Sequence, residues 1–159
     1  MTTSKVEGAV EVKKAPNKSP RHRARELAMQ GIYQWRITAG DDAQIEKQIH
    51  AEKNLGRYDK ELFSKLLRGA ISHHADLEAL LIPHLDRPLE ELSPVEFSVL
   101  LLGTFELSLH PKVPYKVVIN EAVELAKTFG GTDGHKYVNG VLDRLAPQLR
   151  TLEFAGRAP

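Results

Sequence analysis

Residues 93–129 decide the fold class, and they read SPVEFSVLLLGTFELSLHPKVPYKVVINEAVELAKTF. Ser93-Pro94 is a helix start signal, because serine caps the exposed N–H groups of a helix and proline is favoured at its first position. Glu96 stands where the acidic member of a capping box stands. Apolar residues then recur at helical spacing, and after a proline-bounded turn a second amphipathic stretch starts at Pro114. The segment therefore predicts two consecutive helices.

The same helical period covers most of the chain on either side. It predicts further helices over about residues 20–40, 41–49, 59–82 and 133–147. No stretch alternates between apolar and polar residues as a half-buried strand would. The segment from His84 to Leu92 interrupts the helical pattern midway. We therefore expect an all-α protein of six or seven helices arranged in two lobes packed together.

Composition describes an ordinary globular protein, with 159 residues, 42% hydrophobic and 27% charged. The absence of cysteine excludes disulfides, thiolate metal sites and cysteine nucleophiles. No apolar run is long enough for a membrane span, and the N-terminus lacks the apolar run of a signal peptide. We therefore expect a cytoplasmic protein with no membrane association.

Charge is distributed unevenly, although the net charge is only +1. Residues 1–26 carry seven basic and three acidic side chains, which leaves fifteen basic and eighteen acidic ones in the rest. We expect residues 1–18 to form a disordered basic tail, residues 19–150 the helical domain, and residues 151–159 a flexible C-terminal tail. Basic arms often contact nucleic acid phosphates, and a merely solubilising tail is the alternative.

No pattern of residues predicts catalysis or a metal site. The seven histidines form neither a His-x-x-x-His pair nor an HExxH motif. The glycine-rich run 130–134 lacks the phosphate-loop form GxxxxGK[ST] and follows a helix rather than a strand. No nucleophile elbow is present. We therefore expect a binding protein that is not an enzyme and needs no metal or cofactor.

The first expected helix opens with a basic segment that contains Arg21, Arg23 and Arg25. On a helical wheel Arg25 and Tyr33 fall on one flank beside the apolar stripe. Guanidinium groups bind phosphate in a forked geometry, and tyrosine offers a stacking plane for an unpaired base. Positive charge at a helix N-terminus opposes the macrodipole, which suggests that it serves a ligand. A solvated helix face is the alternative interpretation.

A second candidate segment is GGTDGHKYVNG, residues 130–140. Asp133 can cap the helix that follows, and Lys136 and Tyr137 then occupy its first turn. Backbone N–H groups, an ammonium group and an aromatic ring together suit a single-stranded nucleic acid. The alternative is a plain corner between helices with Tyr137 in the core.

The chain resembles the NusB family of bacterial transcription antitermination factors across nearly all of residues 20–147. The strings that carry the resemblance are RARELA at 23–28 with Gln34-Trp35, VPYKVVINEAVELAK at 113–127 and HKYVNGVLD at 135–143. The resemblance implies two three-helix lobes and no catalysis. It also implies binding of boxA, a short single-stranded RNA element of ribosomal RNA leaders, together with the ribosomal protein NusE. The pair then joins other Nus factors on RNA polymerase and suppresses premature termination.

The resemblance also implies which residues bind RNA and which bind NusE. The expected RNA-binding residues are Arg21, Arg23, Arg25, Tyr33, Asp133, His135, Lys136 and Tyr137. Position 22 is histidine where the family's arginine-rich motif often has arginine. The expected NusE-binding residues are Glu96, Tyr115 and Glu121, because a ribosomal protein offers basic side chains.

Alternative functions exist within and beyond this resemblance. The same fold occurs fused to ribosomal RNA cytosine methyltransferases, but 159 residues leave no room for such a domain, so we expect none. A NusB-like RNA-binding or protein-interaction module with another role in ribosomal RNA biogenesis is the alternative. A DNA-binding helical protein is a further alternative. A salt-dependent preference for unpaired RNA over duplex DNA would distinguish an RNA-binding protein from it.

Overall fold

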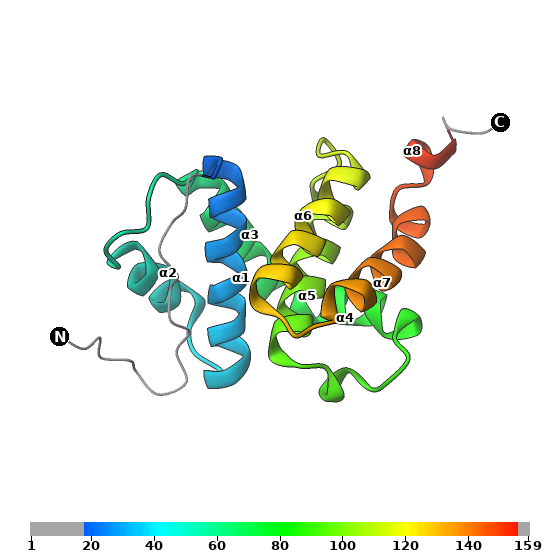
Figure 1. Ribbon diagram of the computed structural model, residues 1–159, viewed down its shortest axis with the longest axis horizontal. Coiled ribbons are helices and arrows are strands. Elements are labelled where there is room, and N and C mark those ends of the chain that lie inside the picture. Colours follow the sequence, from blue (N-terminus) through cyan, green and yellow to red (C-terminus); the bar gives the residue numbers. More distant parts are fainter. Residues whose placement is uncertain (1–17, 156–159) are drawn as a thin grey trace. The chain divides into compact units, whose positions relative to one another are not determined.

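The computed structural model describes residues 18–155 (Figure 1), and every regular element among them is a helix. The eight α-helices are α1 (Pro20–Thr38), α2 (Asp42–His50), α3 (Lys60–Ser72), α4 (His74–Leu81), α5 (Pro94–Leu109), α6 (Tyr115–Phe129), α7 (Gly134–Leu149) and α8 (Thr151–Ala155). Two short 3-10 helices, η1 (Ile82–His84) and η2 (Leu89–Glu91), lie between α4 and α5. The all-α expectation is confirmed. The expected tail over residues 1–18 lies outside the described residues except for Lys18.

The chain divides into two compact units at residue 72, and each contains its own helices. The first unit contains α1, α2 and α3, and the second contains α4 to α8. Helix 59–82 was expected to be continuous, but α3 ends at Ser72 and α4 begins at His74. The apolar period continues through this break, because Ala70 and Leu77 are both buried at helical spacing. Periodicity alone therefore carried no signal of the boundary.

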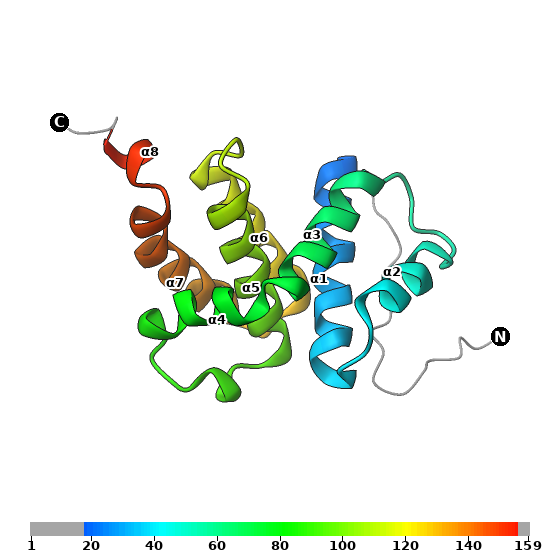
Figure 2. The ribbon, with the colours of Figure 1, turned by 180° about the vertical axis from the view of Figure 1, so that it is seen from behind.

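The first unit packs α1 against α2 and α3, which Figure 2 shows from behind. Helix α1 begins as its sequence predicts, since the Ser19 hydroxyl accepts a hydrogen bond from the His22 N–H at 3.1 Å. Gly31 permits close packing, because a Cβ atom added there would lie 2.7 Å from Leu67 Cδ1 and 3.2 Å from Ile49 Cδ1. These apolar contacts fix the face of α1 that turns away from solvent.

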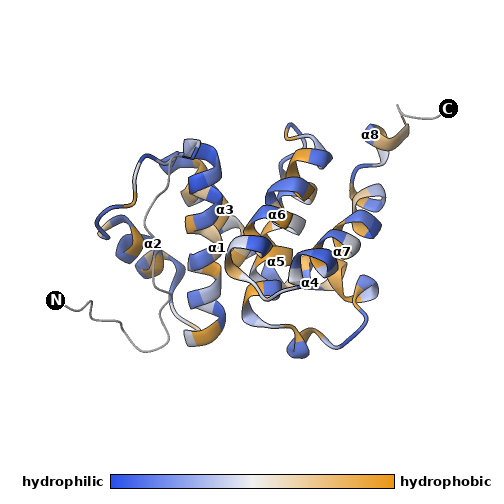
Figure 3. Ribbon diagram, in the orientation of Figure 1, coloured by the Kyte–Doolittle hydropathy of each residue, from blue (hydrophilic) through white to orange (hydrophobic). Residues whose placement is uncertain are grey.

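Helix α5 is the centre of the second unit, and its residues 97–107 are all buried. Its start is a capping box: the Ser93 hydroxyl accepts from the Glu96 N–H at 3.1 Å, and the Glu96 carboxylate accepts from the Ser93 N–H at 3.2 Å. Helices α4, α6 and α7 contact α5. Figure 3 shows hydrophilic and hydrophobic residues alternating around the turns of α6 and α7, as expected of helices with one buried face.

The end of the second unit departs from the expected flexible tail over residues 151–155, which form α8. The buried Arg150 guanidinium donates hydrogen bonds to three carbonyl groups at the end of α5, those of Glu106, Leu107 and His110, at 2.7–3.1 Å. It also pairs with the Glu153 carboxylate at 2.7 Å. The Glu106 and His110 carbonyl groups also accept backbone N–H groups, so Arg150 adds a second donor to each of them and holds the start of α8 against the end of α5. Residues 156–159 of the expected tail lie outside the described part.

No helix among residues 18–155 is both long enough and apolar enough to cross a bilayer.

Candidate functional site

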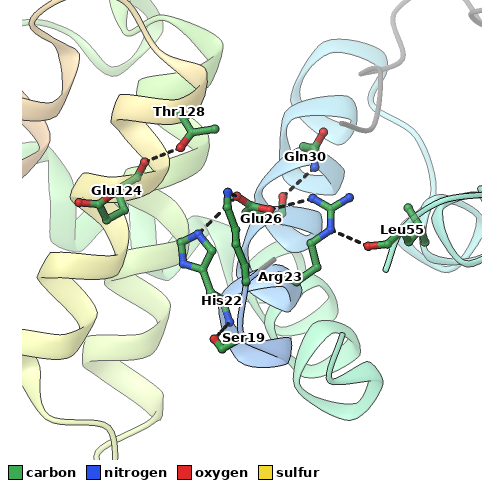
Figure 4. Close-up of polar contacts among 9 residues, drawn as sticks. Ser19, His22, Arg23, Glu26, Gln30, Leu55, Glu124 and Thr128 are labelled. Carbon is green, nitrogen blue, oxygen red and sulfur yellow. Dashed lines mark hydrogen bonds and ion pairs between the residues drawn. The ribbon is translucent and has the colours of Figure 1, made fainter. Parts of the chain in front are cut away.

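The basic segment at the start of α1 is organised by one carboxylate, that of Glu26 (Figure 4). Arg23 Nη1 donates to Glu26 Oε1 at 2.8 Å, and His22 Nε2 lies 3.3 Å from Glu26 Oε2. The Lys18 ammonium group also pairs with this carboxylate. Burial raises the pKa of Glu26, but the hydrogen bonds from His22, Lys18 and Arg23 outweigh burial and lower the pKa from 4.5 to about 2. Glu26 is therefore ionised at neutral pH and partly neutralises the segment.

Two of the three predicted RNA-binding arginines are buried. Arg23 is only 1% exposed, and its Nε donates to the Leu55 carbonyl at 2.9 Å. Arg25 is 5% exposed. Little of either side chain is therefore accessible to a ligand, and the expected RNA contact of Arg23 and Arg25 stays a prediction. Arg21 is exposed and Tyr33 is partly exposed.

The Arg23 guanidinium has a structural role in the first unit. One of its donors binds a carbonyl in the segment between α2 and α3, and another binds Glu26 within α1. A buried arginine needs such partners, since an uncompensated buried charge is costly. Arg23 therefore fixes the start of α1 on the loop at Leu55, and Glu26 in turn holds His22 and Lys18. Arg21 is the exposed arginine at this end of α1.

The second candidate segment lies at the N-terminus of α7 in the second unit. Asp133 and Lys136 are both exposed and approach each other to 3.5 Å. The Asp133 side chain makes no capping hydrogen bond, so the expected cap is absent. His135 and Tyr137 are partly exposed. All four residues predicted for this segment thus lie at the start of α7, and the side chains of Asp133 and Lys136 are 74% exposed.

Tyr137 has a partner that the sequence did not reveal. The Arg87 guanidinium carbon lies 4.4 Å from the centre of the Tyr137 ring, which is a cation–π contact. Asp86 accepts from Arg87 Nε at 2.8 Å, and its backbone N–H lies 3.4 Å from the Tyr137 hydroxyl. Burial is the largest cause that raises the pKa of Tyr137, so the phenol stays neutral at pH 7. Only the interruption at residues 84–92 had marked this region, and nothing in it pointed to a tyrosine fifty positions away.

The three predicted NusE-binding residues are spread along α5 and α6 rather than clustered, and their contact with NusE stays a prediction. A Cβ atom added to Gly134 would lie 3.7 Å from Glu96 Oε2, so Glu96 stands beside the start of α7. Tyr115 lies at the opposite end of α5, where its N–H donates to Glu153 at 3.0 Å and its ring packs on Phe154 with centroids 4.4 Å apart. Roughly 20 Å of α5 separates the two ends. Glu121 is partly exposed on the second turn of α6.

The region around α7 and Arg87 has little net charge. Arg87 and Lys136 face the carboxylates of Asp86, Asp133 and Glu96. A ligand at this segment therefore meets stacking surfaces and hydrogen-bond donors more than a field of positive charge. Among residues 18–155 no group of three potential metal-ligating side chains gathers.

Comparisons with known proteins match residues 22–147 to the NusB family. The transcription antitermination protein NusB of Ralstonia nicotianae is 55% identical over 144 residues, which cover 91% of this chain and 93% of that protein. The NusB of Nitrosomonas eutropha is 54% identical over 137 residues, covering 86% of this chain and 82% of that protein.

Solved structures give the same result. The structure of T. maritima NusB matches with a TM-score of 0.75 and 31% identity over 87% of this chain and 99% of that one. A crystal structure of the antitermination factors NusB and NusE in complex with dsRNA contains a chain that matches with a TM-score of 0.73 and 27% identity, covering 80% of this chain and 96% of that one. The resemblance inferred from the sequence is thereby confirmed, and the chain belongs to the NusB family of transcription antitermination proteins.

Proposed function

We propose that this protein acts in transcription antitermination by binding single-stranded boxA RNA of ribosomal RNA leaders together with NusE. The observation that carries the proposal is the similarity, over 80% of the chain, to a protein solved with NusE and dsRNA. The choice of a single-stranded RNA rests on the family resemblance. The RNA-bound pair would then join other Nus factors on RNA polymerase and suppress premature termination. This function is one of binding and includes no catalytic step, and its place is the bacterial cytoplasm, where transcription occurs.

The described residues support a division of labour within each unit. In the first unit, exposed Arg21 is the group best placed to reach phosphate, while buried Arg23 acts as a positioning residue through Leu55 and Glu26. Tyr33 keeps enough exposure to contact a base. Charge-assisted contacts of this kind supply the salt-dependent part of RNA affinity.

In the second unit, RNA contact is proposed for His135, Lys136 and Tyr137 at the start of α7. Lys136 is exposed, and its ammonium group lies 3.5 Å from Asp133, which tempers its charge. Backbone N–H groups at the start of a helix add donors for a phosphate. These groups suit an unpaired RNA strand, whose bases are open to stacking.

NusE contact is best supported at Glu96. Glu96 stands next to the proposed RNA segment, so a partner there could share the RNA with this chain. Tyr115 is covered on one side by Phe154 of α8 at the other end of α5, which fits a packing role. A carboxylate at an interface rim mainly sets association rate and specificity, and a basic ribosomal protein would complement it.

The test is a fluorescence anisotropy titration with labelled single-stranded boxA RNA, with and without purified NusE. We expect weak binding by this protein alone and much tighter binding when NusE is present. A scrambled RNA of equal composition, the same RNA as a duplex, and duplex DNA are the competitors. Equal affinity for the scrambled strand, or no gain from NusE, would overturn the proposal in favour of a general RNA-binding or protein-interaction module.

A further inference from the structure

Arg87 lies in the connection between η1 and η2, a segment that several contacts fasten to α7. Arg144 Nη2 donates to the His84 carbonyl at 2.8 Å, and His84 Nε2 lies 3.1 Å from Gln148 Oε1. Further along the same segment, the Asp86 N–H approaches the Tyr137 hydroxyl. The segment therefore runs along α7 and brings Arg87 to its first turn. Its position is set by the fold rather than by chance contact of a long side chain.

The surroundings of Arg87 leave only part of its guanidinium for a ligand. The Asp86 carboxylate takes the edge, accepting from Nε at 2.8 Å and from Nη2 at 3.3 Å. The guanidinium carbon lies over the Tyr137 ring, 4.4 Å from the ring centre. The side chain still keeps 37% exposure. Part of the side chain is therefore open to solvent, and the carboxylates of Asp86 and Glu96 balance its charge.

Resting on the proposed RNA-binding function, we propose that Arg87 is a further RNA-contacting residue. An unpaired base stacks on the face of its guanidinium group that is turned away from the Tyr137 ring. Tyr137 then acts as a positioning residue, because its ring supports the guanidinium group on the side opposite the base. A guanidinium plane stacks on bases much as an aromatic ring does. The earlier interpretation, in which the base stacks directly on Tyr137, requires the RNA to displace Arg87 from the ring and from Asp86.

The two arrangements predict different changes in RNA affinity for the same substitution, Arg87→Ala. If the base stacks on Arg87, Arg87→Ala weakens binding of single-stranded boxA RNA roughly tenfold, within the range measured for the loss of one stacked base. Arg87→Lys weakens it nearly as much, because lysine keeps the charge but has no plane. If RNA displaces Arg87, Arg87→Ala binds as well as the wild type or tighter, since nothing has to be moved.

Salt dependence gives a second readout. A lost phosphate contact lowers the slope of log affinity against log salt by about one, whereas a lost stacking contact leaves the slope unchanged. We expect the wild-type slope in Arg87→Ala. The matched control is Arg68→Ala, because Arg68 is also an exposed arginine paired with carboxylates, Asp42 and Glu46, but lies on α3. Its loss should leave RNA affinity near the wild-type value.

Substitutions at Tyr137 complete the design. Tyr137→Phe keeps the ring under Arg87 and should bind nearly normally, whereas Tyr137→Leu should lose about as much as Arg87→Ala. Thermal unfolding shows whether each variant is folded. Unchanged or tighter binding by Arg87→Ala, or full affinity in Arg87→Lys, would overturn the stacking role. If the wild-type protein binds no RNA at all, the proposed function itself fails, and the two failures are thus distinct.

Discussion

The ionised carboxylate of Glu26 should contribute a large, pH-dependent part of the stability of the first unit. Its pKa is lowered from 4.5 to about 2, which corresponds to about 3 kcal/mol of folding free energy. A lowered carboxyl pKa gives stability that is fully present above pH 4.5 and is lost as the pH falls toward 2. Between pH 5 and pH 3 the loss amounts to about 2 kcal/mol.

The perturbation is Glu26→Gln, which removes the charge with little change in volume. At pH 5 the variant should be about 3 kcal/mol less stable than the wild type, because Arg23 loses its ionic partner while buried. At pH 3 the difference should shrink to about 1 kcal/mol, because the wild-type carboxylate is then losing its advantage. Other carboxylates titrate in both proteins and cancel in the difference.

The assay is urea unfolding followed by circular dichroism at pH 5 and pH 3, a range that avoids usual histidine titration near pH 6–7. Glu52→Gln, at an exposed position of the same unit, is the control and should change stability little at either pH. A difference between wild type and Glu26→Gln that stays constant from pH 5 to pH 3 would refute the reasoning. It would mean that the carboxylate is not held ionised by its three partners.

Four further outcomes follow from the placement of single residues. Arg21→Glu should weaken boxA RNA binding and lower its salt slope by about one without changing helicity, measured by anisotropy and circular dichroism. Asp133→Asn should tighten RNA binding, because it removes repulsion of phosphate and the side chain makes no capping bond that would be lost; weaker binding would contradict this. Glu96→Lys should abolish the gain in RNA affinity from NusE, whereas Tyr115→Ala should leave it intact. Arg150→Met should lower stability by about 3 kcal/mol in urea unfolding, because three carbonyl groups and Glu153 lose a buried donor; a loss below 1 kcal/mol would show that water replaces the guanidinium.

The sequence by itself determined the family and most of the helices, because their signals are local. The Ser19-Pro20 and Ser93-Pro94 starts act through side chains that bind N–H groups within one turn. The spacing of apolar residues indicates which face of each helix is buried, and this holds for any element that the helix packs against. Family membership rested on strings of neighbouring residues that need no knowledge of tertiary contacts.

Only the tertiary structure decided which charged and aromatic side chains are accessible. Arg23 looks like a surface group until the chain brings the Leu55 carbonyl to it from thirty-two residues away. Arg87 meets Tyr137, and Glu96 comes to lie beside the start of α7, because the segments that place them fold back on one another. A helical wheel fixes directions about one axis only. The partners that bury, neutralise or support a side chain come from elsewhere in the chain, and their approach is a property of the folded structure alone.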